Sequence, residues 1–281
     1  MEVIIQPSAG AAADLVAQII AGELRTNPRT VLGLATGGTM ESVYARLVRL
    51  HKEEALDFSG CRTFNLDEYV GLPGDHPNSY RHYMNHHLFR KVNIDPRNTY
   101  LPDGMAPDLE AEGADYERLI AQAGGIDLQL LGIGRNGHMG FNEPLSAFRS
   151  RTRVATLTPE TIRQNAPLFG GPEHMPRRAI TMGVGTILDG RRCVLLATGL
   201  DKAAILAQAI EGPFTCMISA TALQLHPHCA VIADESAGGR LEKSDYYRTI
   251  FMTDPKWEKF RQPAGQANGR ARPSLMQMAG N

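Results

Sequence analysis

The 281-residue sequence has few cysteines, no long apolar run and almost no net charge. Its four cysteines, Cys61, Cys193, Cys216 and Cys229, form no CxxC pair, which argues against a disulfide framework or a structural zinc site and indicates a reducing cytoplasm. No stretch approaches the roughly 18 apolar residues of a membrane span. No basic segment followed by an apolar one opens the chain, so we expect a soluble protein with no targeting segment and no membrane partner.

The charges nearly cancel, because 29 Lys and Arg side chains face 30 Asp and Glu side chains. No global field would draw such a chain to nucleic acid, and a small neutral or anionic ligand fits it better. The hydrophobic content of 43% is enough for one large core. We expect a single domain over 1–260 and a flexible tail over 261–281, which is rich in Gly, Pro, Gln and Ala. The sequence leaves the oligomeric state open, and a homo-oligomer is compatible with it.

Short aliphatic runs alternate with longer amphipathic stretches, which predicts an α/β fold. Such alternation is typical of a doubly wound, mostly parallel, Rossmann-like sheet with helices on both faces. Ligands of these sheets bind at the carboxyl ends of the strands. The predicted strands are Val3–Ile5, Thr30–Leu34, Arg62–Leu66, Asp127–Ile133, Cys193–Thr198 and Cys229–Ala233, and the predicted helices are Ala11–Arg25, Thr39–His51, Ser79–Phe89, Leu109–Ala123, Asp201–Glu211 and Ile218–Leu225.

A glycine-threonine turn follows the second predicted strand and opens a predicted helix. Its residues are Thr36, Gly37, Gly38 and Thr39. Free backbone N–H groups at a helix start, with two hydroxyls beside them, form an anion site that suits phosphate. The alternative is a tight turn that needs glycine only for its backbone conformation.

The segment Gly132–Gly137 matches the GxGxxG fingerprint of dinucleotide-binding folds. That fingerprint requires a helix to begin at the glycines, with its N-terminus on the pyrophosphate. Here the segment runs on through Gly140 to Pro144, which predicts a functional loop instead. We therefore expect no dinucleotide cofactor.

Four polar residues follow predicted strands and are candidates for proton transfer. Asp67 and Glu68 end one strand, where one carboxylate can face the ligand crevice as a general base and the pair can equally be a solvated turn. His138 and Glu143 lie in the loop after another strand and could supply a matched acid and base near neutral pH. By contrast, the i,i+4 pair His82 and His86 lacks a carboxylate-rich context, so we expect a surface helix face and no metal.

These junctions together closely resemble the glucosamine-6-phosphate deaminase family, and the similarity covers most of residues 1–240. The matching segments occur in fixed order, which makes the resemblance specific for the family. They are Leu32–Thr39, Phe64–Leu72, His76–Tyr80, Leu131–Pro144, Ser150–Arg153, Ala179–Gly185 and Ala222–His226.

The resemblance implies a cofactor-independent conversion of glucosamine 6-phosphate and water into fructose 6-phosphate and ammonium. It implies that Asp67 moves a proton from C2 to C1 of the opened sugar, and that His138 opens the ring with the support of Glu143 and Asn136. It further implies that the turn Thr36–Thr39 and Lys202 bind the phosphate, under a mobile lid over residues 144–170.

Two departures from the family pattern leave the exact substrate and the regulation open. Pro167 stands where relatives commonly have a phosphate-binding arginine, and Ala155 stands where allosteric members carry a lysine. Arg163, about one helical turn before Pro167, could bind the same phosphate instead. Asn136 stands where many relatives have Asp, but an amide can still orient His138.

Three alternative functions remain at this stage. They are a deaminase of a different amino sugar or amino-sugar acid, a 6-phosphogluconolactonase-like hydrolase, and a non-enzymatic sugar-phosphate sensor. Lactone hydrolysis needs no base at C2, so Asp67 argues against the hydrolase. The sensor ranks last, because such regulators precede this fold with a helix-turn-helix and this chain starts directly with a strand.

Overall fold

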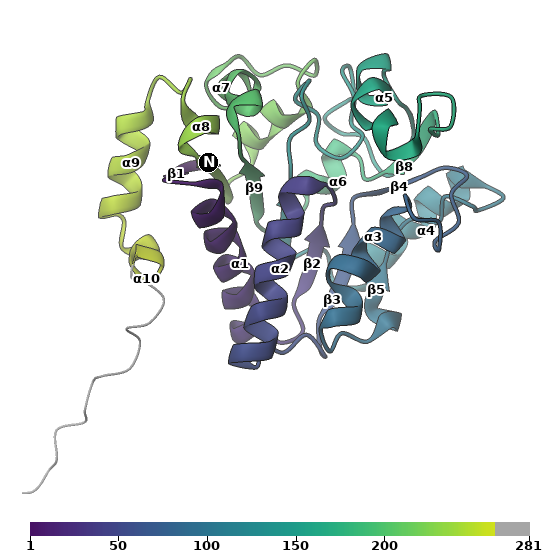
Figure 1. Ribbon diagram of the computed structural model, residues 1–281, viewed down its shortest axis with the longest axis horizontal. Helices are drawn as coiled ribbons and strands as arrows, with labels where there is room; N and C mark the ends of the chain where they lie inside the picture. The colour runs from purple at the N-terminus through teal and green to yellow at the C-terminus, as the bar shows by residue number, and fades with distance from the viewer. Residues whose placement is uncertain (262–281) are drawn as a thin grey trace, which may run out of the picture.

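A seven-stranded parallel sheet forms the centre of the computed structural model, which describes residues 1–261 (Figure 1). Its strand order is β1-β10-β9-β6-β2-β3-β5, and a second sheet, β4-β8-β7, is antiparallel. The expected doubly wound α/β fold is confirmed; the expected tail over 261–281 lies, from residue 262 on, outside the described residues. The strands are β1 (Glu2–Gln6), β2 (Val31–Leu34), β3 (Arg62–Asn65), β4 (Asp67–Tyr69), β5 (Thr99–Tyr100), β6 (Leu128–Leu131), β7 (Arg153–Thr156), β8 (Arg178–Thr181), β9 (Cys193–Ala197) and β10 (Cys229–Asp234).

The helices α1, α2 and α3 lie in front of the sheet, and α4 and α6 lie behind it (Figure 1). Every predicted helix is present except that Ile218–Leu225 forms a 3-10 helix over Ser219–Leu225. The α-helices are α1 (Ala9–Thr26), α2 (Gly38–Glu54), α3 (Tyr80–His87), α4 (Leu109–Gln122), α5 (Pro159–Asn165), α6 (Val184–Leu188), α7 (Ala203–Glu211), α8 (Glu235–Gly238), α9 (Ser244–Thr253) and α10 (Glu258–Arg261), and the other 3-10 helices are Phe89–Lys91, Pro96–Asn98, Ala166–Phe169, Leu200–Lys202 and Pro255–Trp257.

The central strands are continuous apolar runs because helices bury both of their faces. Every residue of β2, β6, β9 and β10 is buried. The helix α1 packs on this sheet through its aliphatic face, and the hydroxyl of Ser8 caps its first turn by accepting a hydrogen bond from the Ala11 N–H. Among residues 1–261, no helix is both long and apolar enough to cross a membrane.

The strand order reverses direction at β2. The chain passes from β2 to β3 and β5 on one side, and then returns to place β6 on the other side of β2. Loops that leave two strands at such a reversal diverge to opposite faces of the sheet and leave a crevice between them. The segments after β2 and β6, which contain the glycine-threonine turn and His138, therefore border the same crevice.

The short strand β4 ties the end of β3 to the second sheet and to α3. The Glu68 carboxylate, 3% exposed, accepts hydrogen bonds at 2.9 Å from the backbone N–H groups of Tyr69, Tyr80 and Arg81. Tyr80 and Arg81 are the first residues of α3, where N–H groups have no partner within the helix. Glu68 is thus a structural residue that fixes the start of α3 beside β4.

We expect Glu68→Gln to lower the free energy of unfolding by about 1–3 kcal/mol, because the side-chain NH2 of Gln replaces one of the two acceptor oxygens and leaves a buried backbone N–H without a partner. Urea unfolding at pH 7 measures the effect. Glu53→Gln, at an exposed position of α2, is the matched control and should change stability by less than about 0.5 kcal/mol. Equal stabilities for the two variants would contradict this role of Glu68.

Candidate functional site

A cavity of about 200 Å³ opens at the carboxyl edge of the parallel sheet. Segments that follow four adjacent strands, β9, β6, β2 and β3, contribute to its walls. The structure brings most of the predicted site residues to this cavity. Those that line it are Thr36, Gly37, Gly38, Thr39, Asp67, His138 and Lys202.

The glycine-threonine turn forms one end of the cavity at the N-terminus of α2. Gly37 is the N-cap residue, with a φ of 111° that favours glycine, and α2 runs for 17 residues behind it. The Tyr44 hydroxyl donates to the carbonyl oxygen of Ala35, and the Tyr83 hydroxyl donates to that of Gly37 at 2.8 Å. These bonds hold the turn, while the first N–H groups of α2 face the cavity with the positive end of the helix dipole.

Lys202 adds a positive charge to the wall of the same cavity from the segment after β9. Burial lowers the pKa of its ammonium group, because a desolvated charge is less stable. A helix N-terminus with two hydroxyls and a lysine beside it is suited to bind an anion such as a phosphate group.

Asp67 differs from its neighbour Glu68 in both orientation and environment. Its side chain is 6% exposed, and what remains exposed lines the cavity. Burial raises the pKa of the Asp67 carboxyl well above its usual range, and the charge of Glu68 adds to the effect. A carboxylate that is destabilised in this way is basic enough to accept a proton near neutral pH.

Close packing around Asp67 depends on the absence of a side chain at Gly140. A Cβ atom there would lie 3.1 Å from Oδ2 of Asp67 and 2.9 Å from Oγ1 of Thr181. Gly140 also has a φ of 57°, in the left-handed region. The loop after β6 can therefore pass directly over the Asp67 carboxyl.

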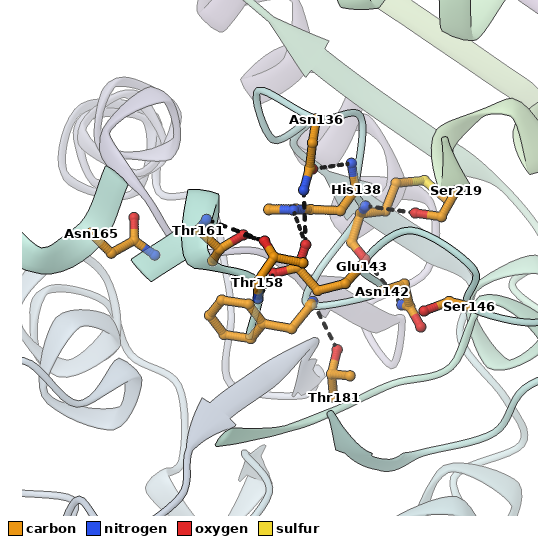
Figure 2. A network of polar contacts seen from close by, with 12 residues as sticks. Asn136, His138, Asn142, Glu143, Ser146, Thr158, Thr161, Asn165, Thr181 and Ser219 are labelled. Carbon is orange, nitrogen blue, oxygen red and sulfur yellow. Dashed lines mark hydrogen bonds and ion pairs between the residues drawn. The ribbon is translucent and has the colours of Figure 1, made fainter. Parts of the chain in front are cut away.

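His138, Glu143 and Asn136 form one hydrogen-bonded group in the loop after β6 (Figure 2). Nδ1 of His138 lies 3.3 Å from Oε2 of Glu143, and Nδ2 of Asn136 donates to the same oxygen at 2.8 Å. The carbonyl oxygen of the Asn136 side chain accepts the His138 backbone N–H at 3.2 Å. Asn136 and Glu143 do not line the cavity themselves; they hold His138, which does.

Glu143 remains ionised over a wide pH range. Burial would raise the pKa of its carboxyl, but hydrogen bonds from His138, Thr161 and Asn136, together with the charge of His138, lower the pKa to about 2. A fixed negative charge at Nδ1 favours the tautomer that carries its proton there, which leaves Nε2 to exchange protons. Asn136 suits this arrangement, since a second carboxylate at 2.8 Å would repel Glu143.

The GxGxxG segment has a structural explanation other than dinucleotide binding. Residues 132–152, between β6 and β7, contain no helix, so no helix N-terminus is available for a pyrophosphate. A Cβ atom at Gly134 would collide with the imidazole of His138. The glycine therefore makes room for His138, as the prediction of a functional loop requires.

The segment 144–170, which we expected to cover the site, forms a wall of the cavity. It contains β7 and α5, and the side chains of Thr161, Gln164 and Asn165 line the cavity from α5. The backbone N–H of Thr158 donates to Oε1 of Glu143 at 3.1 Å, so α5 begins on the group that holds His138 (Figure 2). The mobility of this segment remains a prediction.

Sequence reasoning missed several residues that line the cavity. Thr161, Gln164 and Asn165 have i, i+3, i+4 spacing, which places them on one face of a helix. Thr198 directly follows β9, and the rule that ligands lie at strand carboxyl ends could have identified it. Tyr80, at the start of α3, carried no such signal.

One predicted ligand lies elsewhere. Arg163 is exposed on α5 and does not line the cavity, so its contact with a bound anion remains a prediction. His82 and His86 are exposed on α3. Within residues 1–261, no cluster of three or more His, Cys, Asp or Glu side chains has the geometry to hold a metal ion.

Comparison with known proteins gives concordant matches. Residues 6–232 match the model of the family described as glucosamine-6-phosphate isomerases/6-phosphogluconolactonase. The glucosamine-6-phosphate deaminase of Hahella chejuensis is 49% identical over 250 residues, which cover 89% of this chain and 95% of that protein. The deaminase of Rhodococcus opacus is 45% identical over 260 residues, which cover 92% of this chain and all of that protein.

Solved structures agree with these matches. A monomeric glucosamine-6-phosphate deaminase superposes with a TM-score of 0.84 at 44% identity, covering 85% of this chain and 100% of that chain. The 6-phosphogluconolactonase from Trypanosoma cruzi has a TM-score of 0.68 at 20% identity, covering 86% of this chain and 97% of that chain, and this likeness is one of fold alone.

The environment of Asp67 predicts a variant that is more stable than the wild type. Because the folded state raises the pKa of this carboxyl, its contribution to stability is full below the unfolded pKa of about 3.9 and is lost as the pH rises through the folded pKa. Asp67→Asn should therefore raise Tm at pH 8, by roughly 2–4 °C for each kcal/mol gained.

Thermal unfolding followed by circular dichroism measures this difference. The gain should shrink as the pH is lowered toward 4, because the wild-type carboxyl is then protonated as well. Asp75→Asn, at an exposed loop position, is the control and should leave Tm unchanged at both pH values. A loss of stability in Asp67→Asn at pH 8 would contradict the raised pKa.

Proposed function

The chain belongs to the family of glucosamine-6-phosphate isomerases and 6-phosphogluconolactonases, and from this premise we propose that it is a glucosamine-6-phosphate deaminase. It converts glucosamine 6-phosphate and water into fructose 6-phosphate and ammonium, an isomerisation coupled to hydrolytic deamination. One observation carries the proposal: a buried carboxylate of raised pKa, Asp67, and an imidazole, His138, face one cavity that has an anion site at its end.

The anion site sets the orientation of the substrate. The phosphate binds at Thr36–Thr39 with the helix dipole of α2 and with Lys202. The sugar then extends along the cavity toward Asp67 and His138, which come from the neighbouring segments after β3 and β6. This arrangement brings the C1–C2 end of the sugar to the two groups that transfer protons.

His138 acts first, on the cyclic sugar. Its imidazole takes the proton of the C1 hydroxyl and returns a proton to the ring oxygen, which breaks the bond between C1 and the ring oxygen and yields the open aldehyde. The proton on Nδ1 stays on the imidazole and is donated in a hydrogen bond to Glu143, which remains ionised because hydrogen bonds lower the pKa of its carboxyl to about 2. The imidazole can thus exchange protons at Nε2 in both directions.

Asp67 acts next, on the open form. Its carboxylate removes the proton from C2 while the ammonium group at C2 gives a proton to the carbonyl oxygen at C1, which yields a cis-enolamine. Asp67 then delivers its proton to C1, which leaves a protonated imine at C2. Water adds to this imine, the C–N bond breaks, and ammonia leaves as ammonium after protonation. One carboxylate and one imidazole suffice, because the nitrogen at C2 already stabilises the enolamine.

The environment of Asp67 also favours this function over lactone hydrolysis. Hydrolysis of a phosphogluconolactone requires no proton transfer at C2, so a buried base beside the sugar site would have no role in it.

The four cysteines form no disulfide, which agrees with a reducing compartment. We therefore place the enzyme in the cytoplasm, in the catabolism of amino sugars, including N-acetylglucosamine.

The first test is release of ammonium from glucosamine 6-phosphate. The wild-type protein should release it with formation of fructose 6-phosphate, and Asp67→Asn should lower kcat about 10²–10⁴-fold, because loss of a general base has that effect. Binding of the sugar phosphate should persist, since the amide keeps the shape of the carboxyl. Unphosphorylated glucosamine and a 2-amino-2-deoxygluconate run in parallel; preference for either would refute the proposed substrate.

The second test separates ring opening from proton transfer at C2. We expect His138→Gln to slow turnover of the cyclic sugar while the exchange of the C2 proton in the open form is less affected, because Asp67 performs that step. Solvent deuterium incorporation into fructose 6-phosphate, followed by NMR from both directions of the reaction, measures the two stages. A variant that uses the cyclic sugar as well as the wild type does would exclude His138 from ring opening.

A further inference from the structure

Arg135 lies between two residues that contribute to the site. Gly134, before it, lines the cavity, and Asn136, after it, donates to Glu143. The Arg135 side chain is exposed, and its Nε lies 3.6 Å from Oδ2 of Asp201. Asp201 directly precedes Lys202, so Arg135 is held at the same rim of the cavity as Lys202.

The two positive charges are close enough to influence one another. Burial is the main reason that the pKa of Lys202 is lowered; the charge of Asp201 opposes this shift, and the charge of Arg135 adds to it. Two cations at one rim repel each other, and a bound anion between them relieves this repulsion. Their proximity therefore favours an anionic ligand at this end of the cavity.

The anion site is short of positive charge without Arg135. Among the described residues that line the cavity, Lys202 is the only Lys or Arg. A phosphate monoester carries a charge of about −1.5 to −2 at pH 7, whereas a helix N-terminus supplies about half a positive charge. Pro167 carries no charge, and neither Arg163 nor Arg135 lines the cavity, but the contact with Asp201 places Arg135 beside Lys202. A second cation would balance the site.

We propose that Arg135 binds the phosphate group of the substrate as this second cation, leaving Asp201 and closing over the anion held by Thr36–Thr39 and Lys202. The inference rests on the proposed function. Exchange of partners is favourable because the pair of Arg135 and Asp201 is exposed and 3.6 Å long, and such pairs contribute little stability. A guanidinium can donate hydrogen bonds to two phosphate oxygens at once. The contact of Arg135 with Asp201, at 3.6 Å, is too long for a hydrogen bond of this kind.

Direct binding of anions tests the assignment without relying on turnover. In titration calorimetry with inorganic phosphate and with glucose 6-phosphate, the Kd of Arg135→Ala should be higher than that of the wild type by about 10-fold or more. Arg135→Lys should recover part of the loss. Arg29→Ala, which removes an equal charge at an exposed site, should bind both anions as the wild type does.

Kinetics provide the second readout. If the chain deaminates glucosamine 6-phosphate, Arg135→Ala should raise KM about 10-fold or more with a smaller change in kcat, because the phosphate is remote from the reacting atoms. Wild-type affinity for both anions in Arg135→Ala would overturn the proposal. So would a loss of affinity in Arg163→Ala but not in Arg135→Ala, which would assign the second cation to α5.

Asp201→Asn supplies an independent variant that should gain affinity. Removing this carboxylate frees Arg135 and removes a negative charge from the rim, so both anions should bind a few-fold more tightly. The gain should be smaller when Arg135 is already Ala, since only the effect on Lys202 then remains. An equal gain in affinity in both backgrounds would show that Asp201 does not compete with the phosphate for Arg135, and this would overturn the proposal. If the anions bind as expected but no ammonium is released, the proposed function fails while the anion site stands.

Discussion

The parallel direction of the central strands is the constraint on which the site depends. In a parallel sheet every strand ends at the same edge, so the segments after β9, β6, β2 and β3 meet there although they are far apart in the sequence. The reversal of strand order at β2 opens the space between them. The glycine-threonine turn, Asp67 and His138 thus meet at one edge of the sheet.

Two carboxylates of this site have opposite environments, and the difference agrees with the roles proposed for them. Asp67 is buried, and its charge lies near that of Glu68, so the pKa of its carboxyl rises. Glu143 is surrounded by donors from His138, Asn136 and the start of α5, so its pKa falls to about 2. A pair of acids separated in this way provides one group that exchanges protons and one that remains a fixed charge.

Most of the fold was predictable from the sequence, because buried parallel strands are continuous apolar runs and the helices between them are amphipathic. The strands β4, β5, β7 and β8 were not, since β5 has only two residues and the other three pair with one another in a separate antiparallel sheet. The catalytic candidates Asp67 and His138 follow strands and could be found by position. The segment that contains α5 was expected at the site only from the family resemblance, and its lining residues were not identified, because their contacts arise only when the chain folds back over the cavity.

The three-stranded sheet joins the base to the wall opposite it. Asp67 pairs with Thr181 of β8, and Thr181 pairs with Arg153 of β7, which leads into α5. Backbone hydrogen bonds thus connect Asp67, through β8, to the strand that precedes α5. For protein engineering, β4, β7, α5 and β8 are therefore best redesigned together. Replacing α5 alone would change both the shape of the cavity and the surroundings of Asp67. Redesigning the four elements together would allow the cavity shape to change while Asp67 keeps its pairing with β8.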